Sequence, residues 1–521
     1  MYKLRIFTNR IHCAMMKKNK DWLPIGPGFV SIAESGIETM KKLKLLSVLL
    51  AIAMLAGLIA GCGGDKGNNK ISDSGNYKYG TVHGVSWTNG GQADRADETA
   101  VKRENDRNAE YLADTGNTRI CEAFTYDYRA VGAMFEGGQI PTVINIAATE
   151  PTKLISNGWG RDITEQVKAV GIDLTKFNQD ILNTYKDKDG KIYGLPNSAY
   201  ALSIFCNGQV FIDAGLVNDD GTPKLPTTWQ EVLDYSKIIK DKTGKGGLTL
   251  TACDNNGGWQ FTNVAWNFGA DLVVPNDDGT FTAHVNSPEA VAAMSYYRDL
   301  ALSGTIFGDP VVDKFDVTQN NVKAGNAAMA FSHSGCFAGV SRTDKDGMDP
   351  KAVYEISIPA GPDGTKINLT GGDGYWFAPN ATDDQVIAVL EYFMHYGTWT
   401  NEVTSDMDTS WRNDFKDQLD MNGLNLPDFP VYDSAAREKK NEIMKEYQTN
   451  IDFDKQFGKF YEDVQQAGAL QVEEEGDTQN LYRELAAVIQ QIMGDPENAD
   501  VQALMDTAQA NVQQLLDDFV K

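Results

Sequence analysis

The sequence has few cysteines and histidines, and it lacks the short motifs of the common hydrolases. Its 521 residues include six cysteines and five histidines. No CxxC pair occurs, which excludes a zinc ribbon or a thioredoxin-like redox centre. Neither HExxH nor GxSxG occurs, which excludes the zinc and serine hydrolases that use those motifs. We see no cysteine–histidine pair for nucleophilic catalysis, and we expect no catalytic residues, no metal centre and no cofactor.

Positive charge is also scarce. The chain carries 47 Lys and Arg residues against 72 Asp and Glu residues, for a net charge of −25. The first 61 residues hold nine basic and three acidic side chains, which leaves −31 on the remainder. A surface this acidic repels phosphates and anionic headgroups. We therefore expect no nucleic-acid partner.

A run of seventeen uncharged residues, 45–61, follows the cationic stretch 40–44. A basic segment, an apolar segment and small residues at its end are the pattern of a secretory signal. The alternative is a single membrane-spanning anchor, because seventeen apolar residues reach the lower end of the spanning range. The polar, glycine-containing residues 63–70 read as a flexible tether and favour the signal. Either way, most of the chain is predicted to lie outside the membrane.

The end of this run, Leu-Ile-Ala-Gly-Cys62, resembles the lipobox of bacterial lipoproteins. The resemblance implies lipidation of the Cys62 thiol, cleavage before it, and a lipid-anchored protein on the extracellular face of the cell membrane. Residues 1–39 place a mixed polar stretch ahead of the signal, so we interpret them as a mis-called upstream extension. The predicted division is then a lipoprotein signal peptide over 40–61 and a flexible tether over 62–78.

Beyond residue 78, strand-like and helix-like segments alternate, which favours an α/β architecture with largely parallel sheets. Three helix starts carry capping signals, at Thr227 or Thr228, at Ser287 before a proline, and at Thr382. Asp189-Gly190 predicts a hairpin turn. No linker separates two sequential domains, which fits two lobes built by a chain that crosses between them more than once. The expected strands are 79–87, 119–124 and 142–147, with helices over 97–112 and 130–135.

An ordered series of short matches resembles the family 1 extracellular solute-binding proteins, the receptors of carbohydrate ABC importers. Each match is weak alone, and their order and spacing carry the resemblance. The matches are DIT (162–164), GIDLTKF (171–177), GKIYGLP (190–196), FIDAGL (211–216), PTTWQEVL (226–233), NSPEAV (286–291), AGNAAM (324–329) and GGDGYW (371–376).

The resemblance implies a two-lobed periplasmic-binding-protein-like fold of type II, with the ligand in a cleft between lobes joined by hinge strands. Such proteins close about the hinge on a ligand. The expected crossings are near 199–203, near 360–368, and after a helix ending at about Tyr396. Lobe 1 is predicted over 79–200 and 367–410, and lobe 2 over 201–366 and 411–521. The implied partners of this monomer are a carbohydrate and the permease subunits of an importer.

A sugar site needs aromatic rings for the C–H faces and fixed polar groups for the hydroxyls. We expect such groups in polar loops at the ends of strands. The alternatives left open are a buried Trp87, a helix cap at Asp94, a helix-start charge at Glu150, and a core role for Trp266. The candidates from these loops are Trp87, Asn89, Gln92, Asp94, Tyr126, Glu150, Asp254, Trp259, Trp266 and His333.

Two further candidates come from the glycine-rich run 371–376, read as a loop in which glycines let the backbone approach a ligand. Asp373 would bind hydroxyls and Trp376 would supply a ring, so we expect Trp376→Ala to remove binding and to leave the fold intact. Trp411 and Arg412 are read as lying in a loop after a helix, where they would add a second ring and a donor.

Several alternatives remain open. A glycan-active enzyme would need two carboxylates, which Glu150 and Asp373 could supply. A scaffold or adhesin lipoprotein, or the same fold with a peptide or other solute, is also possible. Long polar segments at 400–430 and 445–480 favour an oligosaccharide. Cys121 and Cys206 lie in strand-like runs, where buried free thiols are expected, with two disulfides as the alternative.

Overall fold

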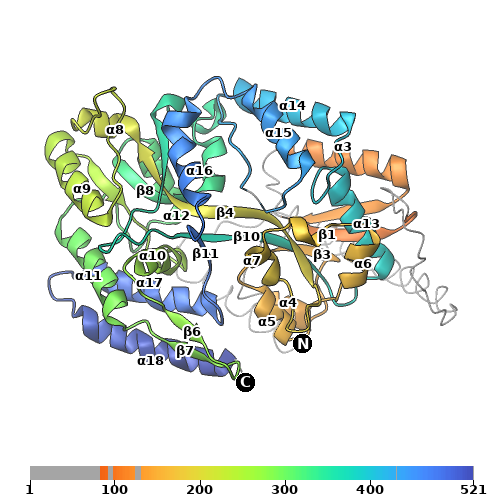
Figure 1. Cartoon of the computed structure of the whole chain (residues 1–521), viewed down its shortest axis with the longest axis horizontal. Coiled ribbons are helices and arrows are strands. Elements are labelled where there is room, and N and C mark those ends of the chain that lie inside the picture. The colour runs from red at the N-terminus through yellow and green to blue at the C-terminus, as the bar shows by residue number, and fades with distance from the viewer. Residues whose placement is uncertain (1–81, 92–97, 124–130, 430, 520–521) are drawn as a thin grey trace, which may run out of the picture. The chain divides into compact units, whose positions relative to one another are not determined.

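The computed structural model describes residues 82–91, 98–123, 131–429 and 431–519 (Figure 1). The predicted signal peptide, Cys62 and the tether lie outside the described residues. So do Gln92, Asp94 and Tyr126, three of the predicted ligand-binding residues. Within the described ranges, no helix combines the length and the apolar character needed to span a bilayer.

Most of the described strands belong to one mixed sheet with the order β2-β1-β3-β10-β4-β8-β5, with β11 beside β10 and β9 beside β4. β1, β2 and β3 are parallel, as are β5 and β8, whereas β10 and β4 are antiparallel to each other. The α/β prediction is confirmed. The sheet is mixed, not largely parallel, because β10 is antiparallel to β3 and β4, and β4 is antiparallel to β8. The strands are β1 (Ser86–Gly91), β2 (Thr118–Ala123), β3 (Val143–Ala147), β4 (Gly194–Asn207), β5 (Gly246–Thr249), β6 (Val273–Pro275), β7 (Phe281–Ala283), β8 (Ala327–His333), β9 (Val353–Ser357), β10 (Asn368–Phe377) and β11 (Leu470–Val472).

Helices pack on the sheet and, among the described residues, build four hydrophobic cores, two large and two small. The two large ones are called the first and the second core. The first core gathers side chains of β1, β3, α6 and α13, and the second gathers those of α9, α10, α11, α17 and α18. The helices are α3 (Glu98–Thr115), α4 (Val131–Glu136), α5 (Pro151–Ser156), α6 (Thr164–Ala169), α7 (Gln179–Asn183), α8 (Gly208–Asp213), α9 (Trp229–Thr243), α10 (Asn256–Asn267), α11 (Pro288–Leu302), α12 (Phe315–Lys323), α13 (Asp383–His395), α14 (Ser405–Asp420), α15 (Ala435–Lys445), α16 (Lys459–Val464), α17 (Thr478–Gly494) and α18 (Val501–Phe519).

The long strands β4 and β10 contribute to both cores. β4 gives Leu195 to the first core and Leu202 to the second, while β10 gives Trp376 to the first and Leu369 to the second. Figure 1 shows the two strands side by side, running from the helices α8 and α9 toward α6 and α7. The middle of this pair therefore lies where the chain passes from one core to the other. The predicted lobe boundaries themselves stay a prediction.

The local signals that the sequence offered are confirmed. Thr228 accepts a hydrogen bond from the backbone of Glu231, and Ser287 caps α11 with proline in its first turn. Thr382 forms a complete capping box with Gln385. The turn before β4 is closed by a bond from the Gly190 amide to the Asp187 carbonyl. These features depend on residues close in sequence, which is why the sequence predicted them.

Three segments read as loops are regular elements. The run 371–376 is part of β10, Trp411 and Arg412 lie inside α14, and Trp259 lies in α10. The glycines of the run suggested a loop, but they are strand residues. Their lack of a side chain lets neighbouring side chains pack closely against β10. Trp87 and Asn89 likewise lie on β1, which begins later than predicted.

The four cysteines of the described residues are free thiols, so no disulfide links them in this structure. Cys206 is fully buried, and burial raises the pKa of its thiol. Cys121 is on β2, as predicted, and is half-buried.

Candidate ligand-binding site

The middle of the β4–β10 pair carries polar side chains close to the crossing between the cores. Tyr200 pairs with Gly371, Ser198 pairs with Asp373, and the register is irregular directly after Asp373. The backbone N–H of Asp373 donates to the Ser198 hydroxyl at 3.3 Å. Irregularities of this kind in a strand re-aim side chains. They place the Asp373 carboxyl near Asn145 and Ser198. Burial raises the pKa of this carboxyl, and hydrogen bonds from Asn145 and Ser198 oppose the rise only in part.

The glycines of β10 make room for tyrosine hydroxyls. A Cβ atom at Gly371 would lie 2.5 Å from the Oη of Tyr200 and 3.3 Å from the Oε2 of Glu473. A Cβ atom at Gly374 would lie 2.3 Å from the Oη of Tyr185. Contacts this close leave no room for a side chain. The absence of side chains at these glycines therefore allows the phenols of Tyr200 and Tyr185 and the carboxyl group of Glu473 to lie against β10.

Aromatic rings from four different elements meet around Tyr200. The ring of Tyr200 lies 4.8 Å from that of His333 and 5.8 Å, edge-on, from that of Trp259. His333 in turn stacks on Phe315 at 6.0 Å. All four side chains are half-buried, so each keeps some accessible surface. We refer to Tyr200, Trp259, Phe315 and His333 as the aromatic wall.

Carboxyl groups lie next to the aromatic wall. Burial raises the pKa of Glu473 to about 8, and the negative charges of Asp373 and Glu150 add to the effect, while Tyr482 and Trp259 oppose it. Burial also raises the pKa of Asp373. A carboxyl group with a pKa near 8 is mostly protonated at neutral pH, so Glu473 can donate one hydrogen bond and accept others.

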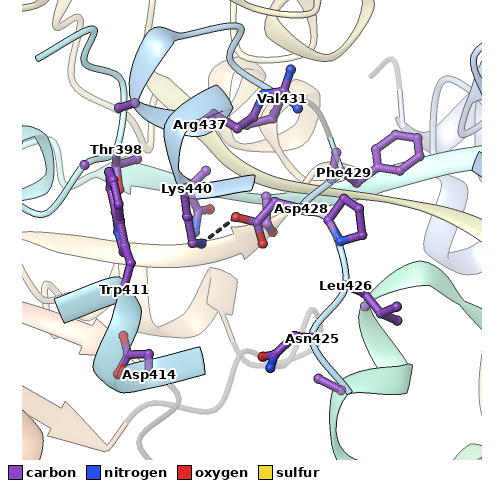
Figure 2. A pocket seen from close by; sticks show the side chains of 18 of the residues that line it. Thr398, Trp411, Asp414, Asn425, Leu426, Asp428, Phe429, Val431, Arg437 and Lys440 are labelled. Atoms are coloured by element: carbon purple, nitrogen blue, oxygen red, sulfur yellow. Dashed lines mark hydrogen bonds and ion pairs between the residues drawn. The ribbon is translucent and has the colours of Figure 1, made fainter. Parts of the chain in front are cut away.

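A cavity of about 670 Å³ lies beside this region and is bordered by Ser198 and Ser334. Its size falls in the range of small-ligand sites. Figure 2 shows its far wall, with Trp411 from α14 and the ion pair of Lys440 with Asp428, whose atoms lie 2.5 Å apart. The other polar and aromatic side chains of its lining include Asn197, Arg342, Tyr396, Trp399, Asp414, Gln418, Asn425, Phe429, Tyr432 and Arg437.

A second cavity of about 300 Å³ lies against Gly371 and Glu473. Its lining also includes Thr149 and the start of α17 at Thr478. Glu473 therefore borders the smaller cavity, and Ser198 borders the larger one. β4 thus borders the larger cavity through Ser198, and β10 borders the smaller one through Gly371.

Four predicted site residues gather in this region. His333 and Trp259 are in the aromatic wall, and Glu150 and Asp373 are the acidic neighbours of Glu473. Trp411 lines the larger cavity, although only 7% of its surface is exposed. That these residues contact a ligand stays a prediction, but their convergence from five separate elements gives it a structural basis.

Other predicted residues do not line either cavity. Trp87 and Trp376 are buried in the first core at 1% and 0% exposure, and Trp266 is buried while its indole donates to Glu474 at 2.7 Å. A ring without accessible surface cannot stack on a ligand, so the expected stacking role of these tryptophans is corrected to a packing role. Asn89 is buried as well, on β1.

Arg412 and Asp254 are also displaced from their expected roles. The Arg412 guanidinium forms ion pairs with Asp408 and Glu446 at 2.7 Å each, on α14 and after α15. Its donors are therefore engaged by protein carboxylates. Asp254 is exposed just before α10, with a positive φ of 51°.

Nothing in the sequence pointed to Tyr200, Phe315 or Glu473 as site residues. Tyr200 does lie in the predicted hinge segment, which was the one usable signal. Glu473 belongs to the acidic run 473–475, and nothing local distinguishes it from its exposed neighbour Glu475. Its role depends on contact with Gly371, about a hundred residues earlier in the chain.

A cysteine–histidine pair, which we did not expect from the sequence, is present in the structure. The Sγ of Cys336 lies 3.0 Å from the Nε2 of His333. Burial lowers the pKa of His333 to about 4 and raises that of Cys336 to about 11. Both groups are therefore neutral at pH 7. Because the thiolate is the nucleophilic form, this geometry does not activate the cysteine.

Sequence comparison finds relatives among binding proteins. A binding protein of Brucella abortus is 25% identical over 317 residues, which cover 57% of this chain and 73% of the relative. Residues 126–394, just over half of the chain, match the family described as bacterial extracellular solute-binding protein.

Solved structures share the fold. One is a solute-binding protein of an ABC transporter from Thermotoga lettingae, bound to α-D-tagatose. It has a TM-score of 0.62 at 19% identity, and the match covers 83% of this chain and 100% of the Thermotoga chain. UgpB from Mycobacterium tuberculosis, in complex with glycerophosphocholine, has a TM-score of 0.62 at 16% identity, covering 84% and 99%. The fold is thus the two-lobed one of periplasmic binding proteins, and the chain belongs to the bacterial extracellular solute-binding protein family.

Proposed function

We propose that this protein binds a carbohydrate at the aromatic wall and the neighbouring carboxyl groups, and that an ABC importer receives the sugar from it. The observation that carries the proposal is the meeting of Tyr200, Trp259 and His333 with Asp373 and Glu473 beside a cavity of about 670 Å³. Rings can cover the C–H face of a sugar, and carboxyl groups can bind its hydroxyls.

The charge of the site favours a neutral ligand over a phosphodiester. Burial raises the pKa of Glu473, and the charges of Asp373 and the buried Glu150 lie close enough to raise it further. The same closeness would repel a phosphate group. A sugar hydroxyl, in contrast, can donate to the Asp373 carboxylate and accept from the protonated Glu473. We therefore prefer a sugar to a ligand like the one bound by UgpB.

The larger cavity supports an oligosaccharide. The long polar segment 400–430 contributes Trp411, Asp414 and Asn425 to its lining, and the segment 445–480 contributes Glu473 to the smaller cavity. These segments extend the polar surface beyond the aromatic wall. A ligand with more than one ring would contact both the wall and the polar lining around Asn425.

Closure about the β4–β10 pair would complete the site. Both strands join the two cores, so a small change in their backbone angles would move one core relative to the other, as in hinge closure of binding proteins. Closure would remove water from the ligand and strengthen its polar contacts. Lipidation of Cys62 would keep the protein beside the importer at the extracellular face of the membrane.

A thermal-shift screen of the full chain tests the ligand class. The panel contains neutral mono- and oligosaccharides, glycerophosphodiesters and short peptides. A ligand present at 100 times its dissociation constant stabilises the folded state by about 2.7 kcal/mol, so we expect a rise of several degrees in Tm with at least one saccharide. A shift with peptides or phosphodiesters and with no saccharide would contradict the carbohydrate proposal.

A further inference from the structure

The C-terminal ends of α3 and α13 bring together three potential metal ligands. Glu110 and Asp114 lie four residues apart near the end of α3, and His395 is the last residue of α13. One ligand atom from each side chain lies within 4.8 Å of those of the other two. Both carboxylates are exposed and His395 is half-buried, so the group is open to solvent. It is separate from the aromatic wall and its carboxyl groups.

The electrostatics of this place favour a cation. The C-terminal end of a helix carries a partial negative charge, and acidic side chains there are unfavourable. Asp114 lies in the last turn of α3, and Glu110 lies one turn earlier on the same face, where like charges repel. Among the described residues, neither carboxylate forms an ion pair with a lysine or arginine. The nearby Arg107 instead lies over the ring of Tyr396, 5.3 Å from its centroid.

The donor set selects the kind of cation. Calcium and magnesium prefer oxygen ligands only, whereas zinc and similar ions accept imidazole nitrogen together with carboxylates. Zinc–ligand distances of about 2.1 Å place neighbouring ligands about 3.4 Å apart. The observed spread of 4.8 Å exceeds this by little more than 1 Å. Rotation of the exposed Glu110 and Asp114 side chains can supply that movement.

We propose that Glu110, Asp114 and His395 bind a divalent transition-metal ion of the zinc class, with water at the remaining positions. The ion offsets the charge of the two carboxylates and ties α3 to the end of α13. The next residue, Tyr396, lines the larger cavity. The metal site therefore holds in place the segment that brings Tyr396 to the lining of the larger cavity. It does not depend on the identity of the proposed sugar.

Calorimetric titration of the tag-free, chelator-treated full chain with ZnCl2 tests the site. We expect one binding event in the wild type and at least a tenfold weaker one in His395→Ala and in the Glu110→Gln/Asp114→Asn double variant. His284→Ala is the matched control, because His284 is an exposed histidine in a different region, and it should bind zinc as the wild type does. MgCl2 and CaCl2 should give little heat.

Stability measurements provide a second readout that does not depend on heats of binding. Zinc should raise the Tm of the wild type and of His284→Ala, and it should leave the Tm of His395→Ala unchanged. Three results would overturn the proposal. These are the absence of zinc binding by the wild type, unchanged binding by His395→Ala, and a loss of binding that appears equally in His284→Ala.

Discussion

Replacing Trp376 by alanine is expected to lower the free energy of unfolding by about 3–5 kcal/mol, the usual cost of removing a buried aromatic ring. The ring is 0% exposed and stacks on Tyr193, with 6.0 Å between centroids. Its indole N–H donates to the backbone carbonyl of Trp159 at 2.9 Å. The variant would leave a cavity and would remove the donor to this half-buried carbonyl, and both changes are destabilising.

The fit around this ring is tight, which limits relaxation of the cavity. A Cβ atom at Gly160 would lie 2.4 Å from the Cζ2 of Trp376. Urea denaturation followed by circular dichroism measures the effect, with Trp376→Phe as a variant that keeps most of the volume and should lose less. An unchanged midpoint for the alanine variant, together with lost ligand binding, would restore the stacking role that the sequence suggested.

Replacing Glu355 by glutamine is expected to stabilise the protein at neutral and alkaline pH. Glu355 lies on β9, is 1% exposed, and has no hydrogen-bond partner for either carboxyl oxygen among the described residues. Burial raises its pKa from 4.5 to about 8, and the Ser203 hydroxyl only partly opposes this. The native state therefore holds a protonated carboxyl group at pH 7, which the amide of glutamine resembles in shape and charge.

The pH dependence follows from the raised pKa. Below pH 4.5 the group is protonated in both the folded and the unfolded chain, so its contribution to stability is fully present. As the pH rises toward 8, the unfolded chain releases the proton and the folded chain retains it, so stability is lost. The full difference is on the order of 4–5 kcal/mol. The variant should match the wild type near pH 4, exceed it increasingly as the pH rises to 8, and keep that advantage above pH 8.

Denaturation midpoints from pH 4 to pH 9 measure this difference. The raised pKa values of Glu473 and Glu474 affect both proteins alike and cancel in the comparison. Glu402→Gln, at an exposed position, is the matched control and should follow the wild type throughout. If Glu355→Gln and the wild type lost stability in parallel across this range, Glu355 would be ionised in the folded state.

The sequence predicted those parts of the fold that depend on neighbouring residues. The capping box at Thr382 and the proline-started helix after Ser287 are determined within four residues. The family resemblance added the order of the elements and the crossings near 199–203 and 360–368. β4 changes core between Leu195 and Leu202, and β10 does so between Leu369 and Trp376, just after the second predicted segment. That these are hinge crossings between lobes stays a prediction.

The site was predicted less well because its residues are brought together by contacts between segments that are far apart in the sequence. Glycines in β10 suggested a ligand-binding loop, yet Gly371 is there because Tyr200 and Glu473 approach the strand. Trp376 and Trp259 have similar local surroundings, rich in glycine and polar residues. Trp376 fills the first core, whereas Trp259 keeps some accessible surface. Packing between segments far apart in sequence determines which of the two rings is buried.

Calorimetric titration with the saccharide identified by screening tests the central claim most directly. The proteins are the wild type, Trp259→Ala, Asp373→Asn and the exposed control Asp384→Asn, each checked for an unchanged folded spectrum. Loss of a ring contact or of a charged hydrogen bond costs about 1.5–3 kcal/mol, so the first two variants should bind about tenfold to a hundredfold more weakly and the control should bind normally. Unchanged affinity in both site variants would contradict a sugar site at the aromatic wall.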